Sequence, residues 1–210
     1  MGEAAGRWFG AACAGEALVA TAVGATREET VWKLRRSLPR DAERSVPDDA
    51  RPGYARRVLA LLAELEAGEE SGKAFSLAID YVPGPLARVL TVAARIPIGY
   101  VTTYGAIAKA TGTEARFVGG AMASNPLYPI VPCHRVLGAD LSLVGYGGRK
   151  GEAALRAKLA RLSAEVRGFT AERDVEVADA SLRVSPVEWA IAKAGSGADD
   201  RSRQLTLFPS

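Results

Sequence analysis

Hydrophobic and polar positions follow two different periods in the first eighty residues. Residues 17–24 are short, apolar and rich in β-branched side chains, which predicts a strand. Residues 54–66 carry apolar side chains at helical spacing, at Val58, Leu61, Leu62 and Leu65, and this predicts an amphipathic helix. The pattern also favours a helix over 28–38 and a second strand over 75–82. We therefore expect a small α/β domain over residues 1–82.

The pattern changes to helices after the proline-rich turn at residues 82–85. Apolar positions predict helices over 86–94, over 104–110 with Thr102 or Thr103 as N-cap, and over 114–123. The short glycine-containing turn at 111–113 between the last two is typical of a helix-turn-helix. Residues 141–146 favour a hairpin or wing, and residues 152–166 a closing helix. These elements predict a mainly α winged helix-turn-helix domain over 83–168.

Residues 169–210 form a carboxyl-terminal extension with a weaker pattern. A strand is expected within 175–184 and a short helix within 186–194. The polar run at 195–203 is rich in Gly, Ser and Asp, which indicates a flexible linker. The chain then carries an apolar tip, Gln204-Leu205-Thr206-Leu207-Phe208, on this flexible tail.

Composition and charge narrow the classes of function. The 48% hydrophobic and 24% charged residues are ordinary for a globular protein, and no apolar run is long enough to span a membrane. Residues 1–9 lack the pattern of a signal peptide, so we expect an intracellular protein, in the cytoplasm, nucleoid or nucleus. Residues 84–168 hold eleven Lys/Arg against four Asp/Glu, a surplus of seven positive charges in a chain whose net charge is +3. A basic half beside an acidic half favours nucleic-acid binding.

Two scarce residues stand side by side in Pro132-Cys133-His134-Arg135-Val136. His134 is the only histidine, and Cys133 is one of two cysteines. A neighbouring base can lower a thiol pKa from about 8.5 toward neutrality and make the thiolate a nucleophile. The two prolines that precede the thiol restrict the backbone, as a nucleophile that must be aimed requires. An inert buried thiol beside a core histidine is the alternative.

The second helix of the expected helix-turn-helix has an unusual surface. Arg116 is followed by a run of small residues that includes Gly119 and Gly120, although glycine costs a helix about 1 kcal/mol. Small side chains would let the helix settle into the minor groove while Arg116 fills the gap left by an extruded base. Close packing of this helix on another helix is the alternative.

These segments together resemble the O6-alkylguanine-DNA alkyltransferases, also called methylated-DNA–protein-cysteine methyltransferases. The resemblance rests on residues 116–122, Asn125-Pro126, the Pro-Cys-His-Arg-Val block and Gly145-Tyr146-Gly147-Gly148, with support from 96–99 and 103–105. It is strong over residues 75–150, whereas residues 1–74 share only a general α/β pattern. Asn125, placed eight residues before Cys133, makes the match specific.

The resemblance implies a role for each matching residue. Cys133 would accept the alkyl group, His134 would take the thiol proton through a water, and Asn125 would brace the turn before the nucleophile. Tyr104 and Arg116 would rotate the base out of the helix and replace it. The resemblance also implies two larger sets. The DNA contacts would be Tyr104, Arg116, Gly119, Gly120, Ala121 and Arg135, and the guanine pocket would be lined by Tyr104, Val136, Tyr146, Gly147 and Gly148.

Two points depart from the family pattern. A glutamate on the closing helix orients the histidine in the family; Glu165 is the candidate here and Ser163 the alternative, because the segment after Gly148 is longer than the pattern. The cysteine and histidine ligands of the zinc found in some relatives are lacking, so no metal and no cofactor is expected. Cys13 is expected to be an inert buried thiol.

The resulting hypothesis is DNA repair by a methylated-DNA–protein-cysteine S-methyltransferase. An alkyl group on O6 of a flipped guanine in duplex DNA, or on O4 of thymine, would move irreversibly to Cys133 in one turnover. The protein would act as a monomer on the minor groove, and the tip at 204–208 is similar to peptides that bind sliding clamps. A sensor that flips the lesion without reacting, a winged-helix regulator and a Cys-His hydrolase are the alternatives.

Overall fold

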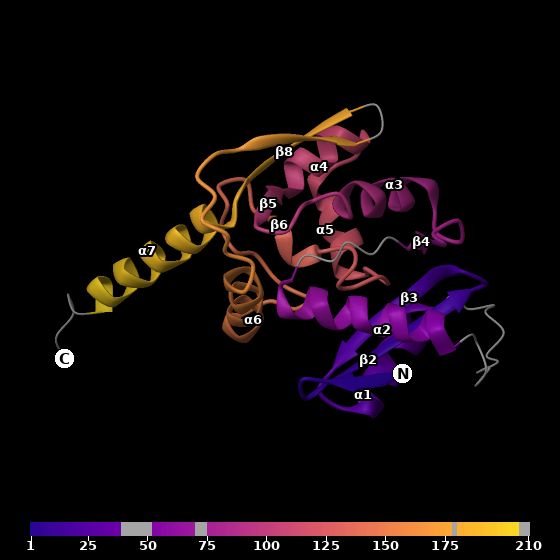
Figure 1. Ribbon diagram of the computed structural model, residues 1–210. Helices are drawn as coiled ribbons and strands as arrows, with labels where there is room; N and C mark the ends of the chain where they lie inside the picture. The colour runs from indigo at the N-terminus through magenta and orange to yellow at the C-terminus, as the bar shows by residue number, and fades with distance from the viewer. Residues whose placement is uncertain (39–51, 70–74, 178–179, 206–210) are drawn as a thin grey trace.

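A four-stranded sheet and two helices form the amino-terminal part of the computed structural model, which describes residues 1–38, 52–69, 75–177 and 180–205 (Figure 1). The sheet order is β1-β2-β3-β4, with β3 antiparallel to β2 and parallel to β4. The strands are β1 (Gly2–Ala4), β2 (Arg7–Ala14), β3 (Ala17–Gly24) and β4 (Ser76–Leu77), and the helices are α1 (Arg27–Ser37) and α2 (Pro52–Ala67). The predicted α/β domain is confirmed.

The carboxyl-terminal part is built around helices and a second small sheet. Its helices are α3 (Gly84–Ala93), α4 (Tyr104–Thr111), α5 (Ala115–Ala123), α6 (Glu152–Ser163) and α7 (Val187–Leu205). Its sheet has the order β6-β5-β8-β7, from β5 (Tyr100–Thr103), β6 (Val136–Leu137), β7 (Arg173–Val177) and β8 (Ala180–Pro186). Because β8 pairs with β5, the extension after residue 168 shares a sheet with the strand that leads into the helix-turn-helix.

The predicted helix-turn-helix is α4 and α5. The Thr103 side chain accepts a hydrogen bond from the Ala106 amide and so caps α4, and Gly112 ends it with a φ of +65°, which a side chain would disfavour. One face of α5 is packed in the core through its buried residues Val118, Ala121 and Met122. The recognition helix is thus held from behind, and its remaining residues face outward.

One hydrophobic core joins the two parts of the molecule. Leu18 of β3 and Leu62 of α2 belong to the same buried cluster as Leu90 of α3 and Ile107 of α4. A second cluster holds α6 and the start of α7 against the small sheet, with Val101, Leu137, Leu162, Val187 and Ala190. Continuous burial of this kind ties the amino-terminal domain firmly to the helix-turn-helix.

Several local predictions were wrong. Residues 141–146 form no hairpin among themselves. The antiparallel pairing here is a single bridge between Tyr146 and Arg149, whose amides donate to each other's carbonyls across Gly147 and Gly148 at positive φ. The expected strand over 75–82 shortens to Ser76–Leu77, and the strand β5 was missed.

Two further corrections concern the ends of the chain. The linker expected over 195–203 is helical, within α7, since the buried first turn of this helix supplies the nucleus from which a helix propagates. Cys13 is exposed, not buried, because the strand register shifts between Ala12 and Cys13 and disturbs the alternation of sides. Among the described residues no helix is long and apolar enough to cross a membrane.

Candidate active site

Cys133 begins a single 3₁₀ turn, Cys133–Arg135, which leads directly into β6. The turn is held by backbone bonds of 2.9 Å from the Cys133 amide to Val131 and from the Arg135 amide to Pro132. Strand β6 runs parallel to β5, with Val136 opposite Thr102 and Leu137 opposite Thr103. Since α4 starts at the end of β5, this pairing brings Tyr104 to the thiol across 29 residues of sequence.

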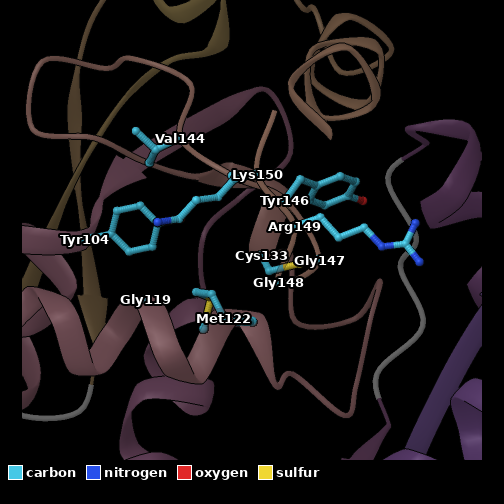
Figure 2. Close-up of a pocket in the computed structure, with 12 residues that line it drawn as sticks. Tyr104, Gly119, Met122, Cys133, Val144, Tyr146, Gly147, Gly148, Arg149 and Lys150 are labelled. Atoms are coloured by element: carbon cyan, nitrogen blue, oxygen red, sulfur yellow. The ribbon is translucent and has the colours of Figure 1, made fainter. Parts of the chain in front are cut away.

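A pocket of about 280 Å³ opens in front of the thiol (Figure 2). Its lining includes Cys133 and four residues expected in the guanine pocket, Tyr104, Tyr146, Gly147 and Gly148, together with Gly119, which was expected among the DNA contacts. The remaining lining comes from Met122 and Ala123 of α5 and from Val144, Gly145, Arg149 and Lys150 of the loop before α6. A volume of this order suits one small planar ring, and the recognition helix forms one of its walls.

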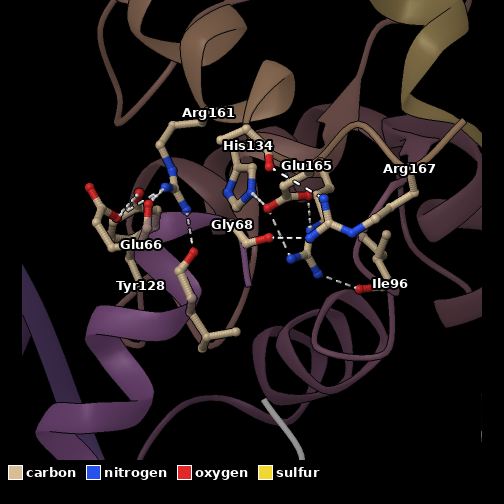
Figure 3. Close-up of polar contacts among 11 residues, drawn as sticks. Glu66, Gly68, Ile96, Tyr128, His134, Arg161, Glu165 and Arg167 are labelled. Atoms are coloured by element: carbon tan, nitrogen blue, oxygen red, sulfur yellow. Dashed lines mark hydrogen bonds and ion pairs between the residues drawn. The ribbon is translucent and has the colours of Figure 1, made fainter. Parts of the chain in front are cut away.

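Behind the thiol, His134 and Glu165 form a fully buried pair (Figure 3). Their Nε2 and Oε1 atoms are 2.6 Å apart. Burial lowers the pKa of His134 to about 4, although Glu165 favours the charged form, so the imidazole is neutral at pH 7. Burial would raise the pKa of Glu165, but hydrogen bonds from His134 and Arg135 lower it to about 2. An ionised carboxylate accepts, so the imidazole proton resides on Nε2.

That tautomer leaves a lone pair on Nδ1 of His134. Nδ1 is buried and has no hydrogen-bond partner among the residues that the structure describes. It is therefore the atom of the pair that can accept a proton. Ser163, the alternative partner, ends α6 and is exposed, whereas the turn closed by the Glu165 amide on the Leu162 carbonyl brings Glu165 inward. The structure thus selects Glu165.

The Cys133 thiol is itself protonated at neutral pH. Burial raises its pKa, and the neighbouring Asn125 amide and Lys158 ammonium offset only part of this effect. A nucleophilic thiolate must therefore form by loss of the proton to a nearby base. The resting site is protected from casual oxidation or alkylation because the thiolate is scarce.

The outward face of α5 is exposed, whereas Cys133 and the His134–Glu165 pair are buried. Arg116 and Gly120 are exposed, and a Cβ added to Gly119 or Gly120 would meet no atom within 4 Å. Internal helix packing therefore does not require these two glycines, which removes the alternative explanation for them. Their smallness keeps the helix surface flat beside the pocket, as close approach of a groove requires.

Comparison with known proteins relates the segment that carries this site to one family. Residues 86–166 match the family model described as the DNA-binding domain of 6-O-methylguanine DNA methyltransferase. A methylated-DNA–protein-cysteine methyltransferase of Pyrobaculum aerophilum is 58% identical over 53 residues, which are 25% of this chain and 36% of that protein. The O6-methylguanine methyltransferase structure of Mycobacterium tuberculosis is 36% identical and covers 54% of this chain and 67% of its own, with a TM-score of 0.45.

This chain belongs to the 6-O-methylguanine DNA methyltransferase family. A further structure, of Mycobacterium tuberculosis OGT in complex with DNA, is 29% identical and covers 74% of this chain and 84% of its own, with a TM-score of 0.52. This likeness extends the family resemblance to the amino-terminal domain. The matched segment of the Pyrobaculum protein is only about a third of its length.

Asn125 lies where the family resemblance placed it, at the turn between α5 and the nucleophile. Its Nδ2 donates to the Val131 carbonyl at 2.7 Å, and its Oδ1 accepts from the Leu127 amide at 2.9 Å. One side chain therefore closes both ends of the six-residue turn that precedes Pro132 and Cys133. This arrangement fixes the direction in which the thiol enters the pocket.

Two residues expected on the DNA surface of this family member lie in the interior instead. Arg135 is buried, and its guanidinium donates to Glu165 at 2.7 and 3.0 Å and to the Ile96 carbonyl at 2.7 Å. Ala121 is buried because it lies three residues after the core residue Val118 on α5. Val136, expected in the pocket, is fully buried and is not among its lining residues.

Lys158 is a site residue that the sequence analysis missed. It is 1% exposed, and its Nζ donates to the carbonyls of Val136 at 2.7 Å, Val144 at 3.2 Å and Gly145 at 3.4 Å. The same nitrogen lies 5.8 Å from the centre of the Tyr104 ring. Burial lowers its pKa to about 8. Its position on the Leu155–Leu162 face of α6 was the available signal, since a lysine on a core face needs buried partners.

Proposed function

We propose that this protein repairs duplex DNA by transferring an alkyl group from O6 of a flipped guanine to Sγ of Cys133, once per molecule. The observation that carries the proposal is the position of the thiol. Cys133 is at the inner end of a ring-sized pocket, with a neutral histidine behind it and the glycine-lined face of α5 beside it. No cofactor is required by this reaction.

In this proposal α5 enters the minor groove, and the lesion rotates into the pocket. The face with Gly119 and Gly120 approaches the DNA, and Arg116 takes the place of the extruded base. Extrusion costs a few kcal/mol, less for a lesion that pairs badly. Tyr104 lines the pocket from the first turn of α4, and in this proposal it contacts both the flipped base and the adjacent phosphate.

The chemical step is a single displacement at the alkyl carbon. The thiol proton moves through a water to Nδ1 of His134, and Glu165 stabilises the imidazolium that results. The thiolate attacks the alkyl carbon, the S–C bond forms, and the C–O6 bond breaks with its electron pair returning to the guanine. The departing guanine gains one proton, which balances the thiol proton taken up by His134 and exchanges with it through water. The Tyr104 hydroxyl stays protonated, since burial raises its pKa, and can donate a hydrogen bond to the departing base. The thioether is stable, so the protein acts once. The same pocket could accept O4-alkylthymine.

Intact mass spectrometry after incubation with duplex DNA containing O6-methylguanine tests the proposal. We expect one added CH₂ mass per protein, saturating at one equivalent, and no addition in Cys133→Ala. Tight binding without a mass change would instead identify a lesion sensor. Demethylated DNA in excess of one equivalent would identify a hydrolase.

We also propose that residues 204–208 bind a sliding clamp. Helix α7 supports this, because it projects away from the rest of the molecule and carries Gln204 and Leu205 at its far end (Figure 1). Residues 206–208 lie outside the described part of the chain. A clamp pull-down that compares the full chain, a chain ending at Arg203 and the double variant Leu207→Ala/Phe208→Ala tests this. We expect only the full chain to be retained, and equal retention of all three would contradict the proposal.

A further inference from the structure

The amino-terminal domain grips the active-site segment from one side through Thr21 of β3. The Thr21 amide donates to the Pro126 carbonyl at 2.8 Å, and its hydroxyl donates to the Tyr128 carbonyl at 2.8 Å. Thr21 is buried, so water does not compete for these bonds. The backbone between Asn125 and Cys133 is therefore anchored to a strand more than a hundred residues earlier in the chain.

A second contact comes from the end of α2. Two of its last carbonyls, those of Leu65 and Glu66, accept hydrogen bonds from the Arg161 guanidinium of α6 (Figure 3). A cation at this position is favoured by the dipole of α2 and satisfies carbonyls that lack helical partners. The Glu66 carboxylate is held at the same junction, with Oε2 3.7 Å from Arg161 and Oε1 3.3 Å from Arg7.

Glu66 reaches the active site through one side chain, that of Tyr128. The Tyr128 hydroxyl donates to Glu66 Oε2 at 2.8 Å. The ring of Tyr128 meets two site residues edge to face, His134 at 6.2 Å and 78° and Tyr146 at 6.3 Å and 71° between ring centres and planes. Tyr128 thus touches both the proton acceptor and a wall of the pocket, and its hydroxyl is tied to the other domain.

We propose that Glu66 of the amino-terminal domain is a positioning residue for alkyl transfer, because it holds the Tyr128 ring that orients His134 and Tyr146. This inference rests on the proposed function. Edge-to-face contacts are weak and allow a ring to shift, whereas a hydrogen bond at the far end of the ring fixes its position. Displacements well below an ångström already change the rate of a displacement reaction. The amino-terminal domain would then set the rate of a reaction to which it supplies no reacting atom.

Single-turnover transfer from O6-methylguanine duplex DNA, measured over a range of DNA concentrations, tests this. We expect Tyr128→Phe and Glu66→Ala each to lower the maximal transfer rate about fivefold, the effect of one hydrogen bond, with DNA affinity unchanged. The double variant should be no slower than either single variant, because both remove the same bond. Tyr81→Phe is the matched control, since its hydroxyl donates to Val19 within the amino-terminal domain and should leave the rate unchanged.

Glu66→Gln separates positioning from charge. The amide keeps an acceptor for the Tyr128 hydroxyl but loses the attraction to Arg161 and Arg7. A rate close to that of the wild type supports the proposal, and a rate equal to that of Glu66→Ala would assign the effect to charge and overturn it. Wild-type rates in Tyr128→Phe, or additive losses in the double variant, would overturn it as well.

Two controls distinguish failure of this inference from failure of the proposed function. The wild-type protein must first take up one methyl per molecule, since without that the proposed function itself fails. Each variant is assayed well below its unfolding temperature, because a purely structural role would lower the melting temperature without changing the maximal rate of the folded fraction. Transfer from free O6-benzylguanine, which needs no DNA contact, should fall by the same factor as transfer from DNA; a normal rate with the free base would overturn the proposal.

Discussion

The two sides of Cys133 use their charged groups in opposite ways. Behind the thiol, His134, Arg135 and Glu165 are buried and hydrogen-bonded to one another. In front of it, α5 exposes Arg116 to solvent beside two glycines that no neighbour crowds. The charged groups behind the thiol find their hydrogen-bond partners within the protein, whereas the surface in front is left free to contact another molecule. Substitutions behind the thiol should therefore lower both the unfolding free energy and the rate of transfer. Substitutions in front should affect only how the protein binds DNA and flips the lesion.

The largest effect is expected from Glu165→Ala. Loss of the carboxylate leaves the Arg135 guanidinium buried with only the Ile96 carbonyl as acceptor. Breaking a buried pair in this way costs about 3–5 kcal/mol of unfolding free energy. Urea denaturation measures that loss, and intact mass after incubation with methylated DNA should show no transfer. A loss below 1 kcal/mol would mean that the rear is not a tightly coupled unit.

The second effect is a loss of stability in acid. The folded imidazole has a pKa of about 4 against an ordinary 6.5, so the unfolded chain binds more protons between these values. Stability should fall as pH drops from 6.5 to 4, by about 1 kcal/mol per pH unit. Below about pH 4.5, Glu165 adds to the fall, since its folded pKa is about 2 and its contribution is lost as it becomes protonated.

Melting curves between pH 7 and pH 4 check this, with His134→Asn as control. Because His134 is the only histidine, this variant should flatten the curve between pH 6.5 and pH 5. An unchanged slope in the variant would show that other groups cause the acid instability.

A smaller loss of unfolding free energy is expected from Lys158→Met, at the boundary between the buried groups behind the thiol and the pocket. Methionine fills a similar volume, but the carbonyls of Val136, Val144 and Gly145 lose their shared donor. An unsatisfied buried carbonyl, here that of Val136, costs about 1–3 kcal/mol in unfolding free energy. Denaturation measures the loss, and the transfer rate should fall because the pocket loop is released. Wild-type stability would show that water replaces the ammonium.

The smallest change in stability is expected in front, from Arg116→Ala. An exposed side chain should contribute less than about 0.5 kcal/mol. Transfer from methylated duplex DNA should nevertheless fall about tenfold, since one flipping contact is lost. Transfer from free O6-benzylguanine should stay normal. Arg36→Ala, an exposed arginine on α1, is the matched control and should leave both rates unchanged. A lower transfer rate with free O6-benzylguanine would contradict this, because it would show that Arg116 acts on the chemical step and not only through DNA.

The two regions were also predicted with unequal success. Gly119, Gly120 and Cys133 were predicted as site residues because small residues and scarce reactive residues are visible in the sequence without any packing, and Arg116 because it comes just before the small residues. Arg135 was predicted to contact DNA because the sequence shows its charge but not its burial. Lys158 was overlooked for the same reason, although the apolar face of α6 around it contained the signal.

Local pattern predicted elements well where a segment depends on its own residues. Strand β3 and helices α1 to α5 follow from periodicity and caps, with ends within two residues of those expected. Prediction failed for β5, for the loop at 141–146 and for residues 195–203. Strand β5 exists through pairing with β6 and β8, the loop through glycine backbone angles, and the end of α7 through nucleation on the buried first turn.

The amino-acid order alone therefore indicated the family, the helix-turn-helix, the candidate nucleophile and its adjacent candidate base, because these depend on residue identity and short spacing. Tertiary structure decided which acid completes the pair, since Glu165 and Ser163 differ only in which of them the end of α6 turns inward. It also decided the link from Glu66 through Tyr128 to the pocket, which joins residues 62 positions apart. Contacts at that separation arise where the last turn of α2 meets Tyr128 and Arg161 in the folded chain, and no local pattern encodes them.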